Sequence, residues 1–300
     1  MGKIAIITGG TGFVGSNLCR KLVEQQWRVY LITRPSSDYA SIADIKNDVT
    51  IYEDDGDIES LIEFFKQTAA EVVFHLASVF VAEHGHEDID RLVESNLKFG
   101  LHILEAMKAS QTKLLINTGT SWQHYHNATY NPVDLYAATK EAFESLMRYY
   151  STGEGLRVIT LKLFDTYGET DKRPKLINLL NHYAETQQEL QMSPGEQMID
   201  LVHVEDVINA FIKAYEYLYS HEDITDLTFG VATGNPLSLK SVIKIFEALS
   251  GEKLKIQWGG RDYRKREVMT LWTDYERLPN WTCDITIEEG LKRYLSNVVD

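Results

Sequence analysis

A tyrosine and a lysine stand four residues apart in Tyr136-Ala-Ala-Thr-Lys140, where a segment of helical periodicity begins. This spacing places both side chains on one face of a helix. The phenol of tyrosine has an unperturbed pKa near ~10, and a nearby ammonium or a cationic ligand lowers that pKa by favouring the phenolate. The pair therefore predicts a proton-transfer site, in which Tyr136 exchanges a proton with an alcohol or a ketone.

A threonine upstream supplies a second polar group for the same site. The strand predicted at Leu114–Thr118 is followed by Gly119-Thr120-Ser121, and a hydroxyl here can hydrogen-bond the oxygen that Tyr136 protonates. The Tyr-x-x-x-Lys spacing alone is common by chance and also fits an exposed helix start. Together with the strand-end hydroxyls and a glycine loop, it predicts a catalytic set of Thr120, Tyr136 and Lys140.

The glycine loop near the N-terminus predicts where a dinucleotide binds. The apolar run Ile4–Thr8 is followed by Gly9-Gly-Thr-Gly12-Phe-Val-Gly15 and then by an amphipathic segment. Gly9 permits a tight turn, Gly12 lets backbone N–H groups approach a pyrophosphate, and Gly15 lets the helix pack on the strand. Because a strand precedes the glycines and a helix follows them, a dinucleotide site is favoured over a merely tight turn.

The end of the second strand predicts which dinucleotide is bound. An NAD site usually carries an acidic residue about 20 residues beyond the glycines, where it bonds the ribose 2′-hydroxyl. This strand ends in Thr33-Arg34-Pro-Ser-Ser, and its first carboxylate is Asp38, which we consider too late. Arg34 can pair with a 2′-phosphate, helped by the Thr33 hydroxyl. The sequence therefore favours NADP(H). The alternative is that Arg34 is a solvated surface residue and that NAD(H) is bound.

Strands and helices alternate along the first half of the chain. Short β-branched runs predict strands at Ile4–Thr8, Val29–Thr33, Thr50–Tyr52, Val72–Leu76, Leu114–Thr118 and Val158–Leu163. Amphipathic segments predict helices at Val14–Gln25, Ile58–Gln67, Ile89–Ala109 and Tyr136–Tyr150. This alternation, with strands that lack polar alternation, predicts an α/β fold built on a Rossmann-type doubly wound parallel sheet.

The second half is less regular. Helices are predicted at Leu176–Glu185, Val204–Tyr219, Leu239–Ser250 and Ile287–Ser296. We interpret residues 165–300 as a smaller, mixed and partly discontinuous lobe over the carboxyl ends of the strands, where ligands bind in open α/β sheets. Residues 1–164 then form the dinucleotide-binding domain, to which residues 198–224 return.

Composition excludes several classes of function. The 300 residues hold 30 Lys plus Arg against 44 Asp plus Glu, a net charge of −14, which argues against a nucleic-acid partner. No apolar run reaches the ~18 residues of a membrane helix. Cys19 and Cys283 stand far apart, which favours a reducing, cytoplasmic setting. We interpret His84-x-His86 and His124-x-His126 as solvated loop histidines, so no metal site is predicted.

The motifs together resemble the extended short-chain dehydrogenase/reductase family, over nearly the whole chain. The resemblance rests on the glycine loop and on Asp57-Ile58, His75-Leu-Ala-Ser78, Asn96, Thr120-Ser121, Tyr136–Lys140, Tyr167-Gly168, Asp200-Leu-Val-His203-Val-Glu-Asp206 and Arg264-x-x-Glu267. Family members act largely on nucleoside-diphosphate sugars. The resemblance thus implies a nucleotide-sugar enzyme that uses a nicotinamide dinucleotide.

The resemblance also implies roles for the matched positions. Lys140 would hold the nicotinamide ribose and lower the pKa of Tyr136. The cofactor would further contact Gly9, Gly12, Phe13, Val14, Gly15, Thr33, Arg34, Asp57, Ile58, Leu76, Ala77, Ser78, Asn96 and Thr118, with Asp57 and Ile58 at the adenine. The substrate would contact Ser78, Thr120, Ser121, Asp165 and Arg264, with Arg264 at the diphosphate. Helices near Ile89–Ala109 and Tyr136–Tyr150 would pair across a homodimer.

Departures from the family pattern narrow the implied reaction. The family's 4,6-dehydratases carry Asp and Glu after the catalytic threonine, whereas Thr120 is followed by Ser121 and Trp122. Asp165 replaces the usual asparagine, and a carboxylate there would repel a diphosphate. The stretches around Thr120 and Tyr136 are most similar to CDP-abequose and CDP-paratose synthases, which implies reduction of a 4-keto deoxysugar with NADPH. An NAD-dependent 4-epimerase and a non-catalytic dinucleotide sensor remain as alternatives.

Overall fold

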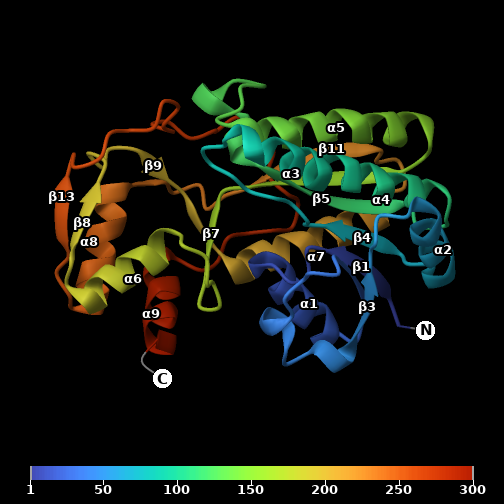
Figure 1. The fold of residues 1–300 in the computed structure, drawn as a ribbon, viewed down its shortest axis with the longest axis horizontal. Coiled ribbons are helices and arrows are strands. Elements are labelled where there is room, and N and C mark those ends of the chain that lie inside the picture. Colours follow the sequence, from blue (N-terminus) through green and yellow to red (C-terminus); the bar gives the residue numbers. More distant parts are fainter. Residues whose placement is uncertain (1, 299–300) are drawn as a thin grey trace.

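The computed structural model describes residues 2–298 and is built around one parallel sheet of seven strands in the order β11-β6-β5-β4-β1-β2-β3 (Figure 1). Its strands are β1 (Ile4–Thr8), β2 (Arg28–Thr33), β3 (Val49–Glu53), β4 (Val72–His75), β5 (Leu114–Thr120), β6 (Arg157–Leu163) and β11 (Asp226–Val231). The chain proceeds outward from β1 to β3 and then returns to place β4 on the other side of β1. This reversal creates the switch point at which open α/β sheets bind ligands. The predicted α/β fold is confirmed.

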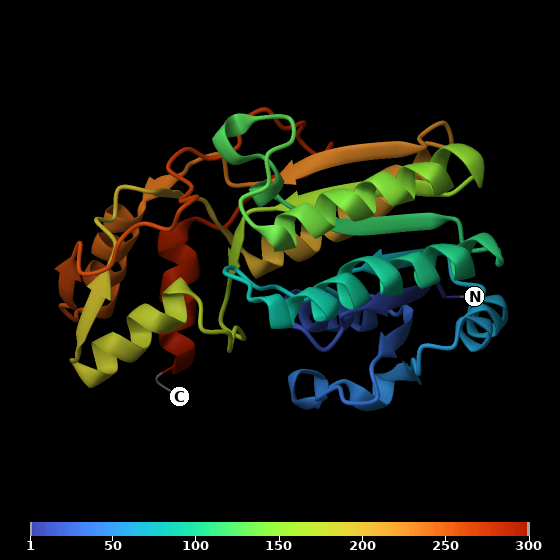
Figure 2. The same ribbon diagram turned by 45° about the horizontal axis from the view of Figure 1, so that its top comes forward.

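Helices cover both faces of this sheet. One face carries α2 (Ile58–Thr68), α4 (Phe99–Lys108) and α5 (Leu135–Gly153), and the other carries α1 (Phe13–Glu24) and α7 (Val204–Ser220) (Figure 2). The interior strand β1 packs against both layers, since Ile6 packs with the first set of helices and Ala5 and Ile7 pack with the second. Burial on both faces explains why the strands are apolar throughout.

Two features of this part differ from the predicted elements. The seventh strand, β11, lies within residues 165–300, yet it pairs in parallel with β6 along its whole length. The helix predicted at 89–109 is divided into α3 (Ile89–Val93), a π-helical turn (Glu94–Lys98) and α4. Such a turn inserts an extra residue into a helix and is often found beside functional sites. Here it contains Asn96, which is buried.

The remaining segments pack into a smaller part beside the carboxyl ends of the strands (Figure 1). It contains α6 (Leu176–Thr186), α8 (Leu239–Ser250) and α9 (Ile287–Val298), which enclose a core of their own. Three two-stranded sheets complete it or join it to the main sheet: β7 (Asp165–Tyr167) with β10 (Leu201–His203), β8 (Glu189–Met192) with β13 (Lys255–Trp258), and β9 (Met198–Ile199) with β12 (Leu237–Ser238). Within residues 2–298, no helix has the length and apolarity that a membrane crossing requires.

Candidate active site

The glycine loop between β1 and α1 has the close backbone approaches that its sequence predicts. Gly9 adopts a φ of +71°, and a Cβ atom there would lie 2.6 Å from the backbone nitrogen of Ala77. A Cβ atom on Gly15 would lie 2.1 Å from the carbonyl oxygen of Gly9. Only glycine fits at these two positions, because each faces backbone that cannot move aside. The loop therefore brings the N-terminus of α1 against the ends of β1 and β4.

A groove of about 720 Å³ opens over this loop. Its walls include seven of the predicted cofactor residues, namely Gly9, Gly12, Thr33, Arg34, Leu76, Ala77 and Ser78. The groove lies at the switch point of the sheet, and the helix N-terminus beside it offers unpaired N–H groups and a positive dipole. These residues fit a dinucleotide, which would supply or accept a hydride when bound.

Arg34 and Thr33 are placed differently within the groove. Arg34 is exposed at the end of β2, and among the described residues its guanidinium has neither an ion-pair partner nor a hydrogen-bond partner. The hydroxyl of Thr33 is buried and bonds the Tyr39 hydroxyl at 3.1 Å, and Tyr39 donates to Glu53 at 3.1 Å. Arg34 is therefore free for an anion, whereas Thr33 is already engaged.

Asp57 and Ile58, which were predicted to contact adenine, do not line the groove. Asp57 is the N-cap of α2 and accepts hydrogen bonds from the amide and the hydroxyl of Ser60, at 3.1 Å and 2.6 Å. The preceding residues Asp54 and Asp55 line the groove in its place. The capping function explains the difference, since an N-cap carboxylate is turned toward its own helix.

Asn96 also lies outside the groove and acts on it through other residues. Its side-chain oxygen accepts from the Val79 amide at 2.8 Å and from the Ser78 hydroxyl at 3.3 Å. Its amide group donates to the Val79 carbonyl at 3.0 Å and to the Thr139 hydroxyl at 2.9 Å. Asn96 therefore ties the loop after β4 to α5 instead of facing the cofactor directly.

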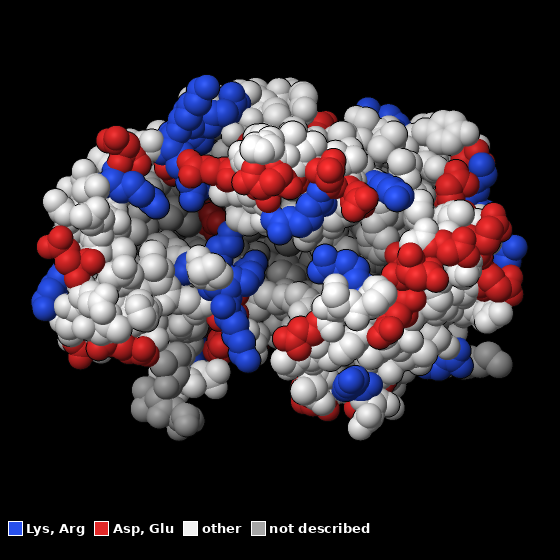
Figure 3. Space-filling view, viewed as in Figure 1, with Lys and Arg blue, Asp and Glu red and all other residues white. Residues whose placement is uncertain are grey.

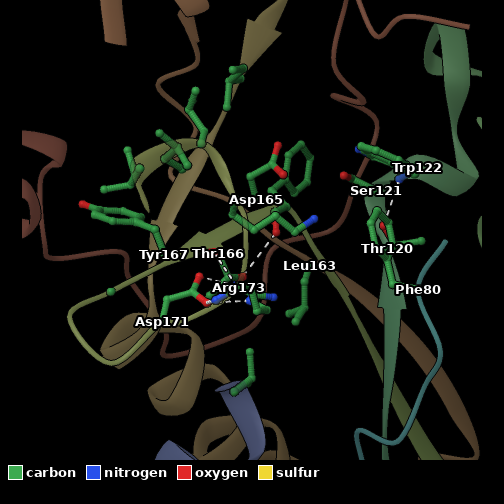
Figure 4. A pocket seen from close by; sticks show the side chains of 18 of the residues that line it. Phe80, Thr120, Ser121, Trp122, Leu163, Asp165, Thr166, Tyr167, Asp171 and Arg173 are labelled. Carbon is green, nitrogen blue, oxygen red and sulfur yellow. Dashed lines mark hydrogen bonds and ion pairs between the residues drawn. The ribbon is translucent and has the colours of Figure 1, made fainter. Parts of the chain in front are cut away.

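A second cavity, of about 280 Å³, lies next to the groove and contains two of the three predicted catalytic side chains, whereas Lys140 lines neither the cavity nor the groove. Thr120, Ser121 and Tyr136 line it, together with Val14, Thr118 and Asp165. In Figure 4, Asp165 and Arg173 lie on one side of this cavity, and Thr120, Ser121 and Trp122 lie on the other. Among the described residues, the buried Thr118 hydroxyl has no hydrogen-bond partner. Phe13 and Gly15 line neither cavity.

Tyr136 and Lys140 share one face of α5, as their spacing predicts, and the Lys140 ammonium lies 5.9 Å from the centre of the Tyr136 ring. Burial and the nearby Asp134 carboxyl raise the pKa of Tyr136 to about 12. Burial also lowers the pKa of Lys140 to about 8. Lys140 is not among the groups that shift the pKa of Tyr136 in the protein alone, where burial has the largest effect. A lowering of the Tyr136 pKa by Lys140 beside a bound dinucleotide stays a prediction.

Charged groups gather at the end of the cavity away from the glycine loop. Burial raises the pKa of the Asp165 carboxyl, while the charges of Lys175, Arg173 and Arg264 lower it. Arg173 forms a bidentate ion pair with Asp171, with both N–O distances at 2.7 Å. Arg264 is exposed and does not line the cavity, although its charge acts on Asp165 and on Asp134. Cations from two segments, one before α6 and one after β13, therefore act on the Asp165 carboxyl.

Residues 5–225 match the model of the NAD dependent epimerase/dehydratase family. The chain belongs to this family. It is 26% identical over 297 residues to a CDP-abequose synthase of Yersinia pseudotuberculosis, with 98% of each chain covered. It is 28% identical over 247 residues to a UDP-glucuronate 4-epimerase of Thermodesulfobacterium geofontis, covering 78% of this chain and 74% of the relative. The fold matches that of a UDP-glucose 4-epimerase of Thermotoga maritima, whose structure was solved with UDP-glucose. The TM-score is 0.87 at 22% identity, and the match covers 99% of this chain and 100% of the other.

Membership confirms the family that the motifs predicted and makes the protein an NAD(P)-dependent oxidoreductase of the extended short-chain dehydrogenase/reductase type. Within this epimerase/dehydratase framework, the tyrosine, the lysine and the strand-end threonine lie beside the dinucleotide groove. Such an arrangement can move a proton at a substrate oxygen while a hydride moves at the adjoining carbon.

Several side chains of the site were not predicted. Phe80 lies 5.0 Å from the Tyr136 ring and 5.8 Å from the Trp122 ring, between ring centres, and the Lys175 ammonium lies 4.0 Å from the centre of the Phe80 ring. Phe80, Trp122, Tyr136 and Lys175 come from four separate segments, so no local spacing connects them.

One prediction about histidines is wrong. His124 was interpreted as solvated, but it is 6% exposed and stacks on Trp272 with the ring centres 3.9 Å apart. Its ring nitrogens meet the Ala128 carbonyl at 3.0 Å and the Lys162 ammonium at 2.9 Å. His84, His86 and His126 are exposed. Across residues 2–298, no three His, Cys, Asp or Glu side chains are grouped to hold a metal.

Proposed function

We propose that this protein reduces the 4-keto group of a nucleoside-diphosphate deoxysugar with NADPH, and its similarity to a protein named CDP-abequose synthase supports a nucleotide-sugar substrate. The relative is matched over almost the full length of both chains. The free Arg34 guanidinium at the edge of the groove carries the proposal, because a net reductase consumes a fresh hydride and NADPH is the usual donor.

The residues of the cavity would perform the proton half of this reduction. Tyr136 is protonated at neutral pH because its pKa is raised to about 12, so its hydroxyl can donate a proton to the oxygen as hydride reaches the carbon. The Thr120 hydroxyl would hydrogen-bond the same oxygen. Lys140, with a pKa of about 8, is mostly cationic at pH 7 and would stabilise the phenolate that Tyr136 leaves behind.

Ser121 and Trp122 support reduction over dehydration. They line the cavity directly after Thr120, and neither can act as a carboxylic acid or base. Removal of water from a sugar needs an acid for the leaving hydroxyl and a base for the neighbouring proton. The positions after Thr120 offer neither group.

The cationic end of the cavity suits a diphosphate. Figure 3 shows Lys and Arg side chains gathered at the hollow between the two parts of the molecule, although the whole chain has a net charge of −14. Arg264 and Lys175 make no ion pair with another described residue, so both can meet phosphate oxygens. We place the sugar between this end and Tyr136, with a weak preference for a CDP-sugar from the relative's name.

We also propose a homodimer formed through α3 and α5. Ile89 and Val93 on α3 are each 44% exposed, and Leu146 and Tyr149 on α5 are 36% and 59% exposed. The two helices lie side by side (Figure 2). An apolar face of this kind on neighbouring helices is typical of a subunit interface.

An NAD-dependent 4-epimerase is the second candidate. Asp54 and Asp55 line the same groove as Arg34, and carboxylates there would favour ribose hydroxyls over a 2′-phosphate. A relative from Thermodesulfobacterium geofontis carries the name UDP-glucuronate 4-epimerase. An epimerase returns its hydride to the same sugar and therefore retains its cofactor.

Cofactor identity separates the two candidates. The purified protein would be extracted and its dinucleotide identified by mass spectrometry, and the apoprotein would then be titrated with NADPH and NADH. We expect exchangeable binding that favours NADPH, and a loss of that preference in Arg34→Ala. The exposed Arg28→Ala is a matched control on the same strand. Tightly retained NAD⁺ would overturn the reductase in favour of the epimerase.

A further inference from the structure

The catalytic side chains stand on two separate elements whose relative position must be fixed. Thr120 ends β5, whereas Tyr136 and Lys140 belong to the first two turns of α5. Between them lies the segment of residues 121–134. A proton transfer requires these groups to be placed within a fraction of an ångström, because reaction rates fall steeply with misplacement. Something other than the chain connection must therefore hold the two elements in register.

Gln123 bridges the two elements with its side chain. It is 0% exposed. Its side-chain oxygen accepts the Thr120 backbone N–H at 2.9 Å. Its amide nitrogen donates to the Glu141 carboxylate at 2.6 Å and to the Glu144 carboxylate at 2.9 Å. Both carboxylates belong to α5, so one buried amide links the catalytic threonine to the catalytic helix.

The two carboxylates are held by a buried lysine. The Lys162 ammonium on β6 lies 3.2 Å from Glu144 and 3.7 Å from Glu141. The same ammonium lies 2.9 Å from the His124 ring nitrogen. Hydrogen bonds to charged groups are stronger than those between neutral groups. The link through Gln123 is therefore rigid, with every polar group of its amide engaged.

Gly119 provides the space that this link requires. A Cβ atom at this position would lie 3.0 Å from each of three atoms: the Gln123 side-chain oxygen, a Glu144 carboxylate oxygen and the Lys162 Cγ atom. The three side chains thus converge on the bare backbone directly before Thr120. This convergence is independent of the hydrogen bonds and shows that the link is packed against the strand end.

We propose that Gln123 is a positioning residue that sets Thr120 against Tyr136 and Lys140 through its hydrogen bonds to the Thr120 backbone and to Glu141 and Glu144. Gln123 lines neither cavity, so it acts through Thr120 and not on a ligand. Its effect on turnover rests on the proposed reductase function. Its effect on the loop geometry does not.

The test replaces Gln123 by methionine, which keeps the length of the side chain and removes the amide. We expect Gln123→Met to lower kcat about 10- to 100-fold, while the Kd for NADPH stays within about twofold, because the dinucleotide groove is untouched. Gln197→Met is the matched control. Gln197 is another buried glutamine, 7% exposed, that bonds Ser193 in the smaller part of the molecule. That control should retain the wild-type kcat.

A second pair of variants covers the case in which Gln123→Met does not fold. Gln123→Glu keeps an acceptor for the Thr120 N–H but places a third carboxylate beside Glu141 and Glu144. Adding Glu144→Gln exchanges the amide and the carboxylate and restores a donor between them. We expect the double variant to exceed Gln123→Glu in kcat by about tenfold. A double variant no better than the single one would overturn the proposal, as would a Gln123→Met kcat within twofold of the wild type.

Hydrogen–deuterium exchange separates this inference from the proposed function. The Thr120 amide should exchange faster in Gln123→Met than in the wild type, because it loses its acceptor, and this readout needs no substrate. If the wild type reduces no 4-keto sugar, the reductase proposal fails while exchange still tests the link. If turnover is present and Thr120 exchange is unchanged in Gln123→Met, the positioning proposal alone fails.

Discussion

Lys140, which we propose is catalytic, carries its charge in a buried environment, and we expect this to lower the stability of the protein. The side chain is 3% exposed, and burial lowers its pKa from 10.5 to about 8. A difference of this size corresponds to about 3 kcal/mol at pH 7, where both the folded and the unfolded forms are mostly protonated. Lys140→Met keeps the approximate volume and removes the charge. The variant should therefore be more stable than the wild type at pH 7 by up to about 3 kcal/mol.

The gain should shrink as pH rises. Because the pKa of Lys140 is lower in the folded protein, the unfolded chain binds more protons between pH 8 and 10.5, and the contribution of this group to stability rises across that window. The loss of stability caused by the buried Lys140 charge falls to about 1.4 kcal/mol at pH 9.5. The advantage of Lys140→Met should consequently fall by about 2 kcal/mol between pH 7 and pH 9.5.

Urea unfolding of both proteins at the two pH values measures this difference directly. Lys66→Met, at an exposed position of α2, is the matched control and should differ from the wild type by less than about 0.5 kcal/mol at both pH values. An advantage of Lys140→Met that does not change with pH would refute the reasoning. Lower stability of the variant at pH 7 would refute it as well.

Three further predictions concern the other parts of the site. Tyr136→Phe should lower kcat about 10²- to 10⁴-fold at an unchanged Kd for NADPH, and a wild-type rate would remove Tyr136 from the proton transfer. Gly15→Ala should abolish dinucleotide binding in calorimetry, because its Cβ atom would lie 2.1 Å from the Gly9 carbonyl oxygen, and a wild-type Kd would contradict the described loop. Burial raises the pKa of the Asp165 carboxyl, and the charge of the ionised carboxyl opposes phosphate. The KM for a diphosphate sugar should therefore rise with pH as Asp165 ionises, whereas the KM of Asp165→Asn should not change with pH. Equal pH profiles for the two proteins would exclude this repulsion.

The sequence was most informative where a function depends on local spacing. Tyr136 and Lys140 share a helix face because they are four residues apart. Gly9 and Gly15 are both required by the same tight turn between β1 and α1. The strands were recognisable because burial on both faces makes them apolar throughout. Nothing in a short run such as β11, however, shows which sheet it joins, because its partner β6 lies more than 60 residues earlier in the chain.

The remaining errors concern contacts between distant segments. His124 is buried because Trp272 covers it, and no sequence pattern around His124 predicts the contact with Trp272. The raised pKa of Tyr136 follows mainly from burial, to which the Asp134 carboxyl two residues earlier adds. Asp57 and Asp54 lie on the same short segment, but the helix cap turns one away from the groove and leaves the other facing it.

The most direct test of the proposed reaction follows the hydride itself. The protein would be incubated with NADPH that carries deuterium on the transferred position and with CDP- and UDP-linked 4-keto deoxysugars, and the products would be examined by mass spectrometry. We predict one deuterium on the sugar for each NADP⁺ formed, with the rate of transfer lowered about 10²- to 10⁴-fold in Tyr136→Phe. Absence of deuterium transfer to these ketones, together with inversion at C4 of a 4-hydroxy UDP- or CDP-hexose by protein that retains NAD⁺, would contradict the reductase and establish the epimerase.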